Sequence, residues 1–248
     1  MADLQVAPAP WKLKGRSWAF LLSPLPDKSS FPAGWATAYQ AEALAGTGEF
    51  IGGPGIIQIV SYSESPVGPY DELIYVPGKW KYADGTKGFR ITKIYVSTKE
   101  STMNGRKNWN IPKQVASFDI KTESDGRTDI TVSHPGAPAP FFKVSIRSIP
   151  VLSALSVPTS TSIFGKFTLL VQPPLPAGDE PEEVCTSAQW ATLVPALKGS
   201  ASLRKLTPGL DGKIGDGVWF PAVVPWSVGL TMENLDMEFG IPTWYDGM

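Results

Sequence analysis

The density of chain-breaking residues is the feature that most constrains this fold. The chain carries 24 glycines and 24 prolines among 248 residues, spread along its whole length. In a helix interior, glycine costs about 1 kcal/mol and proline about 3 kcal/mol relative to alanine, so long uninterrupted helices are excluded. Runs rich in β-branched and aromatic residues recur between the breakers. We expect strands at 17–22, 55–63, 71–76, 89–96, 116–122, 129–132, 141–146, 162–172 and 201–206.

Short turn sequences such as Asp84-Gly85 and Asp125-Gly126 separate most of these runs, which favours antiparallel pairing. Helical patterns occur only at 34–44 and 188–197, too few to alternate with strands as a parallel α/β sheet requires. The sequence therefore predicts a mainly β protein, either a large barrel or a sandwich. A closed barrel could leave room inside for a small ligand. No internal repeat or linker divides the chain, so we expect a single domain over residues 1–248.

Composition disfavours several classes of function. The 22 basic and 23 acidic residues leave a net charge of −1, which offers no basic field for nucleic acid. With one cysteine, Cys185, and one histidine, His134, an intramolecular disulfide and most zinc sites are excluded, and we expect neither a metal nor another cofactor. There is no apolar run of about 18 residues and no signal-like apolar core near the start. We therefore expect a cytoplasmic protein that does not contact membranes.

Lys113 is the first candidate for chemistry. It closes a polar segment, 104–114, for which we expect a loop, and it adjoins the apolar residues Ile111 and Val115. A free lysine has a pKa of about 10.4, so making it neutral at pH 7 costs roughly 4–5 kcal/mol. Burial or a nearby cation removes that cost, and a neutral amine can form a Schiff base with a ketone. The alternative is an ordinary solvated lysine on the surface.

Two further candidates for chemistry, Glu72 and Arg16, lie at strand starts. A Pro/Gly turn delivers Asp71 and Glu72 to the mouth of an apolar strand, where alternation places their side chains on opposite faces. Glu72 shares its face with Ile74 and would point into a barrel. Arg16 opens another strand, and a guanidinium there is suited to a bidentate pair with a carboxylate, although an exposed surface arginine is the simpler interpretation.

These segments resemble the acetoacetate decarboxylase family and its wider superfamily. Gly-Pro-Tyr-Asp-Glu at 68–72 is similar to the family's Gly-x-Tyr-x-Glu element, and the stretch 105–113 is similar to its later element, which begins Gly-Arg and ends Pro-Lys. The resemblance is best over residues 15–119. It implies a large cone-shaped antiparallel barrel that encloses a pocket, with few short helices. It also implies that Lys113 is the Schiff-base lysine, that Glu72 lies beside it, and that Arg16 meets a substrate carboxylate.

Two positions depart from the family pattern. Gln114 stands where acetoacetate decarboxylases have a second lysine, and Gln58 stands where they have a further glutamate, if a one-residue gap is allowed. Superfamily members with such changes catalyse aldol condensation, dehydration or cyclisation in place of decarboxylation. The segment 108–113 resembles divergent fungal members, which implies secondary metabolism. The residues expected to contact the substrate are Gln58, Tyr70, Arg106, Trp109, Gln114 and Trp219.

The resemblance implies a lyase that acts on a keto acid or polyketide-like carbonyl compound through a Schiff base on Lys113. Two alternatives stay open. Lys113 could remain protonated and stabilise an enolate or guide a cyclisation without a covalent intermediate. The barrel could also bind a small apolar ligand with no chemistry at all. The surroundings of Lys113 discriminate between these alternatives. Edge strands could pair in a homo-oligomer, but the sequence identifies no interface for one.

Overall fold

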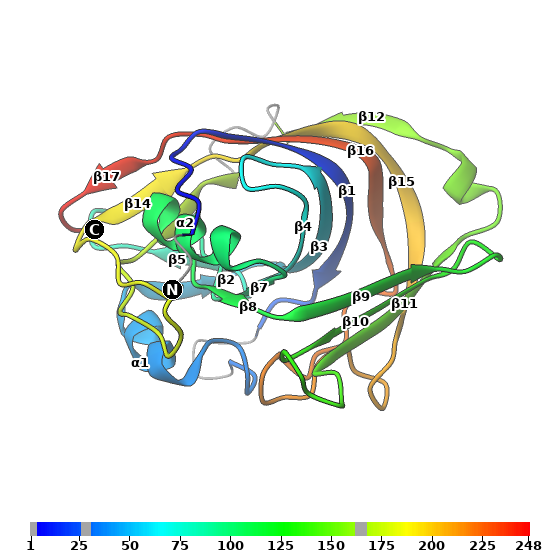
Figure 1. Ribbon diagram of the computed structural model, residues 1–248, viewed down its shortest axis with the longest axis horizontal. Helices are drawn as coiled ribbons and strands as arrows, with labels where there is room; N and C mark the ends of the chain where they lie inside the picture. The colour runs from blue at the N-terminus through cyan, green and yellow to red at the C-terminus, as the bar shows by residue number, and fades with distance from the viewer. Residues whose placement is uncertain (1–3, 26–30, 162–167) are drawn as a thin grey trace.

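The computed structural model describes residues 4–25, 31–161 and 168–248. Its main feature is a sheet of eleven strands that curls into a nearly closed barrel (Figure 1). The strand order is β8-β7-β4-β3-β1-β16-β15-β11-β10-β9, with β12 paired to β15. All neighbours are antiparallel except β7 and β8. In that order the bounds are Lys113–Val115, Lys93–Val96, Tyr70–Val76, Gly55–Glu64, Trp11–Leu22, Val228–Phe239, Ala196–Pro208, Phe142–Ser148, Thr128–Ser133 and Ser117–Thr122, with β12 at Val157–Ser160. The expectation of a mainly β barrel is confirmed.

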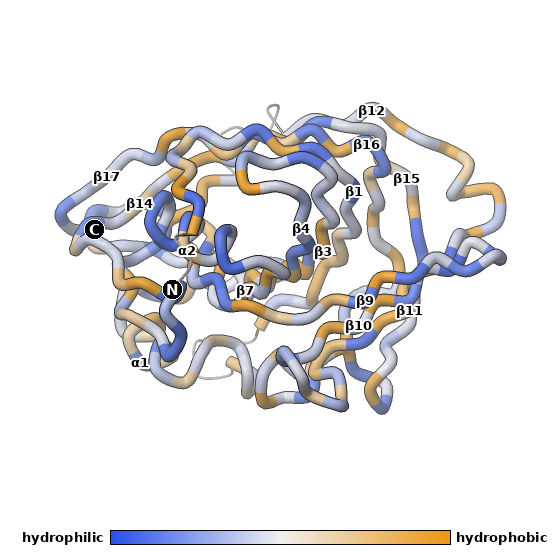
Figure 2. Tube along the Cα trace, viewed as in Figure 1, coloured by the Kyte–Doolittle hydropathy of each residue, from blue (hydrophilic) through white to orange (hydrophobic). Residues whose placement is uncertain are grey.

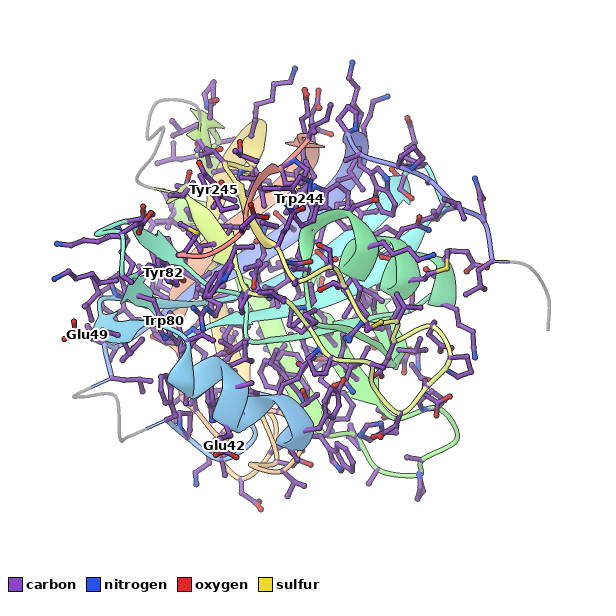
Figure 3. The ribbon with its side chains drawn as sticks, turned by 90° about the vertical axis from the view of Figure 1, so that its left-hand side faces the viewer. Glu42, Glu49, Trp80, Tyr82, Trp244 and Tyr245 are labelled. Carbon is purple, nitrogen blue, oxygen red and sulfur yellow. The ribbon has the colours of Figure 1, made fainter. Side chains whose placement is uncertain are left out.

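A second sheet of six short strands lies at one end of the molecule. Its order is β17-β14-β13-β6-β5-β2, with bounds Thr243–Tyr245, Trp190–Leu193, Leu170–Gln172, Lys87–Phe89, Lys79–Lys81 and Glu49–Gly52. Figure 3 views this end: Trp244 and Tyr245 of β17 lie in the upper half, Trp80 and Tyr82 lie below them, and Glu42 on α1 lies near the bottom. Together with the barrel, this sheet encloses the space in which the candidate site lies.

Helices are few, but their positions differ from the prediction. The helices named within the described residues are α1 (Ala38–Gly46), α2 (Lys99–Trp109) and a 3-10 turn, η1 (Leu152–Ala154). The helix expected at 34–44 is α1, which begins four residues later. The helix expected at 188–197 is wrong, because this stretch forms β14, which pairs with β13 and β17, and the start of β15. None of the helices in the described part of the chain is long and apolar enough to cross a membrane.

The expected polar loop at 104–114 is also wrong over its first half, where α2 forms. Thr98 caps this helix by accepting a hydrogen bond from the Ser101 amide at 3.3 Å, and Asn110 ends it in the left-handed conformation with φ 54°. The side chains that α2 buries are mostly polar, among them Ser101 and Asn104. An amphipathic pattern that would reveal a helix is therefore missing from the sequence.

Several observed strand boundaries differ from the expected ones. The expected strand 89–96 is divided between β6 and β7, and the run 116–122 starts one residue later, as β9. The long β16 was not predicted, because charged residues interrupt its apolar ones. Of the expected strand 162–172, residues 162–167 lie outside the described part of the chain and 170–172 form β13.

The strands β1, β3 and β4 are buried on both faces of the sheet, and a different apolar cluster covers each face. On β4, Tyr70 and Ile74 belong to one cluster, whereas Leu73 and Tyr75 belong to the other. Glu72 shares the face of Tyr70 and Ile74, as expected from alternation. Figure 2 shows hydrophilic residues in the β9–β10 turn at the right-hand edge, which lies away from this core.

Candidate active site

Lys113 and Glu72 form a buried ion pair. The Lys113 Nζ lies 2.7 Å from the Glu72 Oε2, and each residue is only 4% exposed. Glu72 comes from β4 and Lys113 from β8, with β7 between them in the sheet. Lys113 is therefore not the solvated surface group of the alternative interpretation. Because charges in an apolar interior are costly unless paired, the two residues depend on each other for their burial.

Three hydroxyl-bearing residues complete the surroundings of this pair. Lys113 Nζ donates to the Ser101 Oγ at 3.0 Å, and the Tyr62 hydroxyl donates to the Glu72 Oε1 at 3.2 Å. The ring of Tyr70 lies 5.2 Å from the Nζ, within range of a cation–π contact. Burial, reinforced by the negative charge of Glu72, raises the pKa of both tyrosines well above the usual value. Both phenols are therefore neutral, and that of Tyr62 acts as a hydrogen-bond donor to the carboxylate.

The close approach of Gly105 to the Lys113 side chain explains why the motif 105–113 begins with glycine. A Cβ at Gly105 would lie 2.5 Å from Cδ and 2.7 Å from Cε of Lys113, so any larger residue would meet the lysine stem. After α2, the left-handed Asn110 reverses the chain, and its amide donates to the Arg106 carbonyl at 2.9 Å. This reversal brings Lys113 back across the helix at Gly105. The spacing of the motif therefore places the amine against the helix face that carries Ser101.

An apolar cavity of about 260 Å³ adjoins the ion pair. Glu72 lines it, and it also lines a smaller void of about 20 Å³ that contains Lys113. Because Glu72, Ile74, Ile91 and Phe239 line both spaces, the amine lies beside the cavity although it does not itself line it. In the β3–β4 register Val60 lies opposite Glu72. Gln58 lies two residues from Val60 on the same face of β3, and it lines the cavity together with Glu72. The cavity walls come from β1, β3, β4, β13, β15 and β16, together with Phe89, Ile91, Thr161, Thr168 and Pro195.

Two of the expected substrate contacts are close to Lys113. Tyr70 and Trp109 line the small void beside it. The indole nitrogen of Trp109 donates to the Gly240 carbonyl at 2.8 Å, and its ring packs edge-on against Trp11 at 5.3 Å. Trp109 therefore forms a fixed wall.

Arg106 does not lie in the cavity. It is fully buried, its Nε donates to the Val184 carbonyl at 2.8 Å, and its Nη2 donates to the Pro176 carbonyl. The expectation that it binds substrate has no support in this geometry, because the guanidinium points into the segment 176–184. Arg106 fastens that segment to α2.

Arg16 and Trp219 are not brought to the ion pair either. On β1, Ser17 and Ala19 face the cavity, so Arg16 lies on the opposite face, with its guanidinium 5.0 Å from the Trp18 ring. Trp219 is 47% exposed and packs edge-on against His134 at 4.1 Å. Neither residue lines the cavity or the small void. The expected carboxylate contact by Arg16 therefore does not fit this placement.

Gln114 also faces away from Lys113. Its Nε2 donates to the Glu183 Oε1 at 3.2 Å, and its Oε1 accepts from the Lys93 Nζ at 3.4 Å. Lys93 is only 2% exposed, and burial lowers its pKa to about 8. Gln114 therefore belongs to a second polar cluster on the other face of the sheet, and it lines neither the cavity nor the small void.

Sequence reasoning missed Ser101 and Tyr62, and it included Gly105 only as the first residue of the motif 105–113, without a role. Tyr62 was within reach, because it lies opposite Tyr70 in the β3–β4 register and alternation places it on the same face as Gln58. Ser101 carried no signal, since α2 itself was not predicted. Among the described residues, no three His, Cys, Asp or Glu side chains gather where a metal ion could bind, and Cys185 is exposed.

Comparisons with known proteins give the fold its context. An acetoacetate decarboxylase from Legionella pneumophila superposes with a TM-score of 0.62 at 11% identity, over 96% of this chain and 88% of that one. An acetoacetate decarboxylase-like enzyme from Sphingomonas wittichii gives 0.57 at 11% identity, over 98% and 95%. An enduracididine biosynthesis enzyme with HEPES bound gives 0.52 at 15% identity, over 97% and 88%.

No protein-family model and no curated protein matches the sequence. The structural likeness extends over nearly the whole chain, and it agrees with the resemblance carried by residues 68–72 and 105–113. At these identities the likeness concerns the fold. The chain has the fold of the acetoacetate decarboxylase and the acetoacetate decarboxylase-like enzyme that it superposes on.

Proposed function

We propose that this protein is a lyase of the acetoacetate decarboxylase-like superfamily that binds a carbonyl substrate as a Schiff base on Lys113. One observation carries the proposal: a buried lysine, held by a carboxylate at 2.7 Å, adjoins an apolar cavity. The structural neighbours include acetoacetate decarboxylase, which supports enzymatic activity on this fold.

The geometry supports a sequence of balanced steps. Proton transfer from Lys113 to Glu72 leaves a neutral amine, which attacks the substrate carbonyl, and the proton held by Glu72 lets the carbonyl oxygen leave as water so that an iminium ion forms. The iminium then accepts the electron pair of an adjacent carbon–carbon bond as carbon dioxide leaves, or that of an adjacent carbon–hydrogen bond whose proton passes to Glu72. In the first case a proton from solvent adds to the enamine carbon; in the second the enamine expels the β-hydroxyl group as water with the proton from Glu72. Hydrolysis of the iminium then frees the product and Lys113. Tyr62, bonded to the other carboxylate oxygen, keeps Glu72 aimed at the amine.

Reductive trapping tests this proposal. The protein is incubated with a panel of ketones and keto acids plus borohydride, and adducts are located by peptide mass spectrometry. We expect an adduct on Lys113 that the folded Lys113→Ala variant lacks. Lys93 provides the matched control, because it is the other deeply buried lysine near β8 and Lys93→Met should leave the adduct unchanged. No adduct on Lys113 with any panel member, or equal labelling of Lys113→Ala, would refute the Schiff base.

The tight ion pair favours a second candidate. If Lys113 remains an ammonium ion beside Glu72, its charge can stabilise an enolate during a cyclisation or isomerisation without a covalent bond. In that case borohydride traps nothing, yet turnover of a carbonyl substrate still requires Lys113. Binding without any turnover would instead indicate a barrel that only holds a small apolar ligand.

A further inference from the structure

The chemical character of the cavity wall points to a class of substrate. Aliphatic, methionine and phenylalanine side chains make up most of the lining, including Ile56 and Val76 on one side and Leu170 and Met232 on the other. Among the described lining residues, Glu72 is the only one that carries a charge. A ligand in this space therefore meets apolar surface except near Glu72, Gln58 and a few hydroxyl groups.

The size of the cavity sets the size of the ligand. A cavity of about 150 Å³ holds benzene, with six non-hydrogen atoms. By that measure, the 260 Å³ here accommodates about ten non-hydrogen atoms. A small keto acid such as acetoacetate, with seven, would leave part of the apolar wall uncovered.

The charges around the cavity disfavour an anionic ligand. Among the described residues that line the cavity there is no cation; Lys113, which lines the adjoining void, already bonds Glu72 at 2.7 Å, and Arg16 lies on the other face of β1. A carboxylate in the cavity would lose its hydration without gaining a cation from these lining residues, and it would lie near the negative charge of Glu72. A neutral carbonyl compound carries neither penalty.

From volume, lining and charge together, we infer that the cavity selects a neutral, mainly apolar ketone or aldehyde of about ten non-hydrogen atoms over a keto acid of the same length. The carbonyl end lies near Glu72 and Lys113, and the hydrocarbon end lies against β13 and β16. This inference rests on the proposed function for the orientation of the carbonyl, and it narrows the chemistry to the loss of water, because a neutral ketone has no carboxylate to release as carbon dioxide. The preference for a neutral ligand is a statement about binding and is measured separately.

The test compares two probes of nearly equal length, 2-nonanone and 7-oxooctanoate, by calorimetric titration of the full chain without borohydride. We expect 2-nonanone to bind at least about tenfold more tightly. Gln58→Lys should narrow or reverse the preference, because it places a cation in the lining. Gln5→Lys, the same substitution at an exposed position, should leave the preference unchanged.

The outcomes separate this inference from the proposed function. Equal or tighter binding of 7-oxooctanoate by the unaltered chain overturns the inference, and so does failure of 2-nonanone to bind, even if borohydride then traps a keto acid on Lys113. Preferential binding of 2-nonanone without any adduct supports the inference and counts against the Schiff base. Because the unaltered protein decides the result, misfolding of Gln58→Lys would not obscure it.

Discussion

Gly105→Ala is the substitution that most directly tests how α2 positions Lys113. The added Cβ would lie 2.5 Å from Cδ and 2.7 Å from Cε of the lysine, well inside van der Waals contact. The stem has little room to move, because Ser101 and Glu72 hold its Nζ at 3.0 and 2.7 Å. We therefore expect the amine to be displaced from its place beside Glu72.

The magnitude follows from two opposing effects. Alanine in a helix interior is favoured over glycine by about 1 kcal/mol, whereas overpacking a buried site costs about 1–3 kcal/mol. Gly105→Ala should therefore destabilise the protein by about 1 kcal/mol. In a Lys113→Ala background the clashing atoms are gone, so the same substitution should stabilise by about 1 kcal/mol. The coupling between the two positions is thus about 2 kcal/mol.

Urea unfolding of the four proteins in this cycle measures the coupling without any knowledge of the substrate. A second readout is the borohydride adduct on Lys113, which should form at least about tenfold more slowly in Gly105→Ala, since a shift of about 1 Å in a reacting group costs up to 10²-fold. The matched control is Gly46→Ala at the end of α1, where an added Cβ meets nothing within 4 Å. A coupling within about 0.5 kcal/mol of zero, with unchanged trapping, would refute this account of the motif.

Three further predictions concern residues outside the ion pair. Arg90 is fully buried and donates to the carbonyls of Leu44 and Thr47 at the end of α1. Arg90→Met should therefore lower the free energy of unfolding by about 3 kcal/mol or more, and a loss below about 1 kcal/mol in urea titration would contradict this. Burial lowers the pKa of Lys93 from 10.5 to about 8, so the folded chain releases a proton that the unfolded chain keeps. The difference in free energy of unfolding between the unaltered protein and Lys93→Met should therefore rise by up to about 3 kcal/mol between pH 8 and 10.5, and it should show no such rise below pH 8. A difference that does not change with pH would argue against the lowered pKa of Lys93. Trp219 lies outside the cavity lining, so Trp219→Ala should leave calorimetric binding of 2-nonanone unchanged within about twofold, and a larger change would place it in the site.

The strand-rich part of the fold was predictable because glycine and proline turns separate runs of β-branched residues. The orientation of Glu72 was predictable too, since alternation along one short strand sufficed. Arg16 could not be placed in the same way. Its strand buries Trp18 on one face and Ser17 on the other, and where both faces are covered, alternation does not say which of them carries the cavity.

Helix α2 was beyond prediction for a related reason. Ser101, Asn104 and Arg106 are buried because they bond to other parts of the chain, not because they are apolar. Hydrophobic periodicity detects apolar burial only. The helix caps, Thr98 and Asn110, are the local signals that remained, and both residues are also common in loops.

The place of Gln114 in the structure changes what its identity means for Lys113. Neighbouring residues on a strand point to opposite faces, so Gln114 bonds Glu183 and contacts Lys93, while Lys113 bonds Glu72. A lysine at 114, the residue that the family pattern has there, would also point away from the Lys113 amine, and its charge would act on the amine from a distance and not by contact. Glutamine at this position therefore removes no contact from the Nζ. Under the proposed Schiff-base mechanism, a substitution at Glu72 should alter borohydride trapping on Lys113 more than one at Gln114.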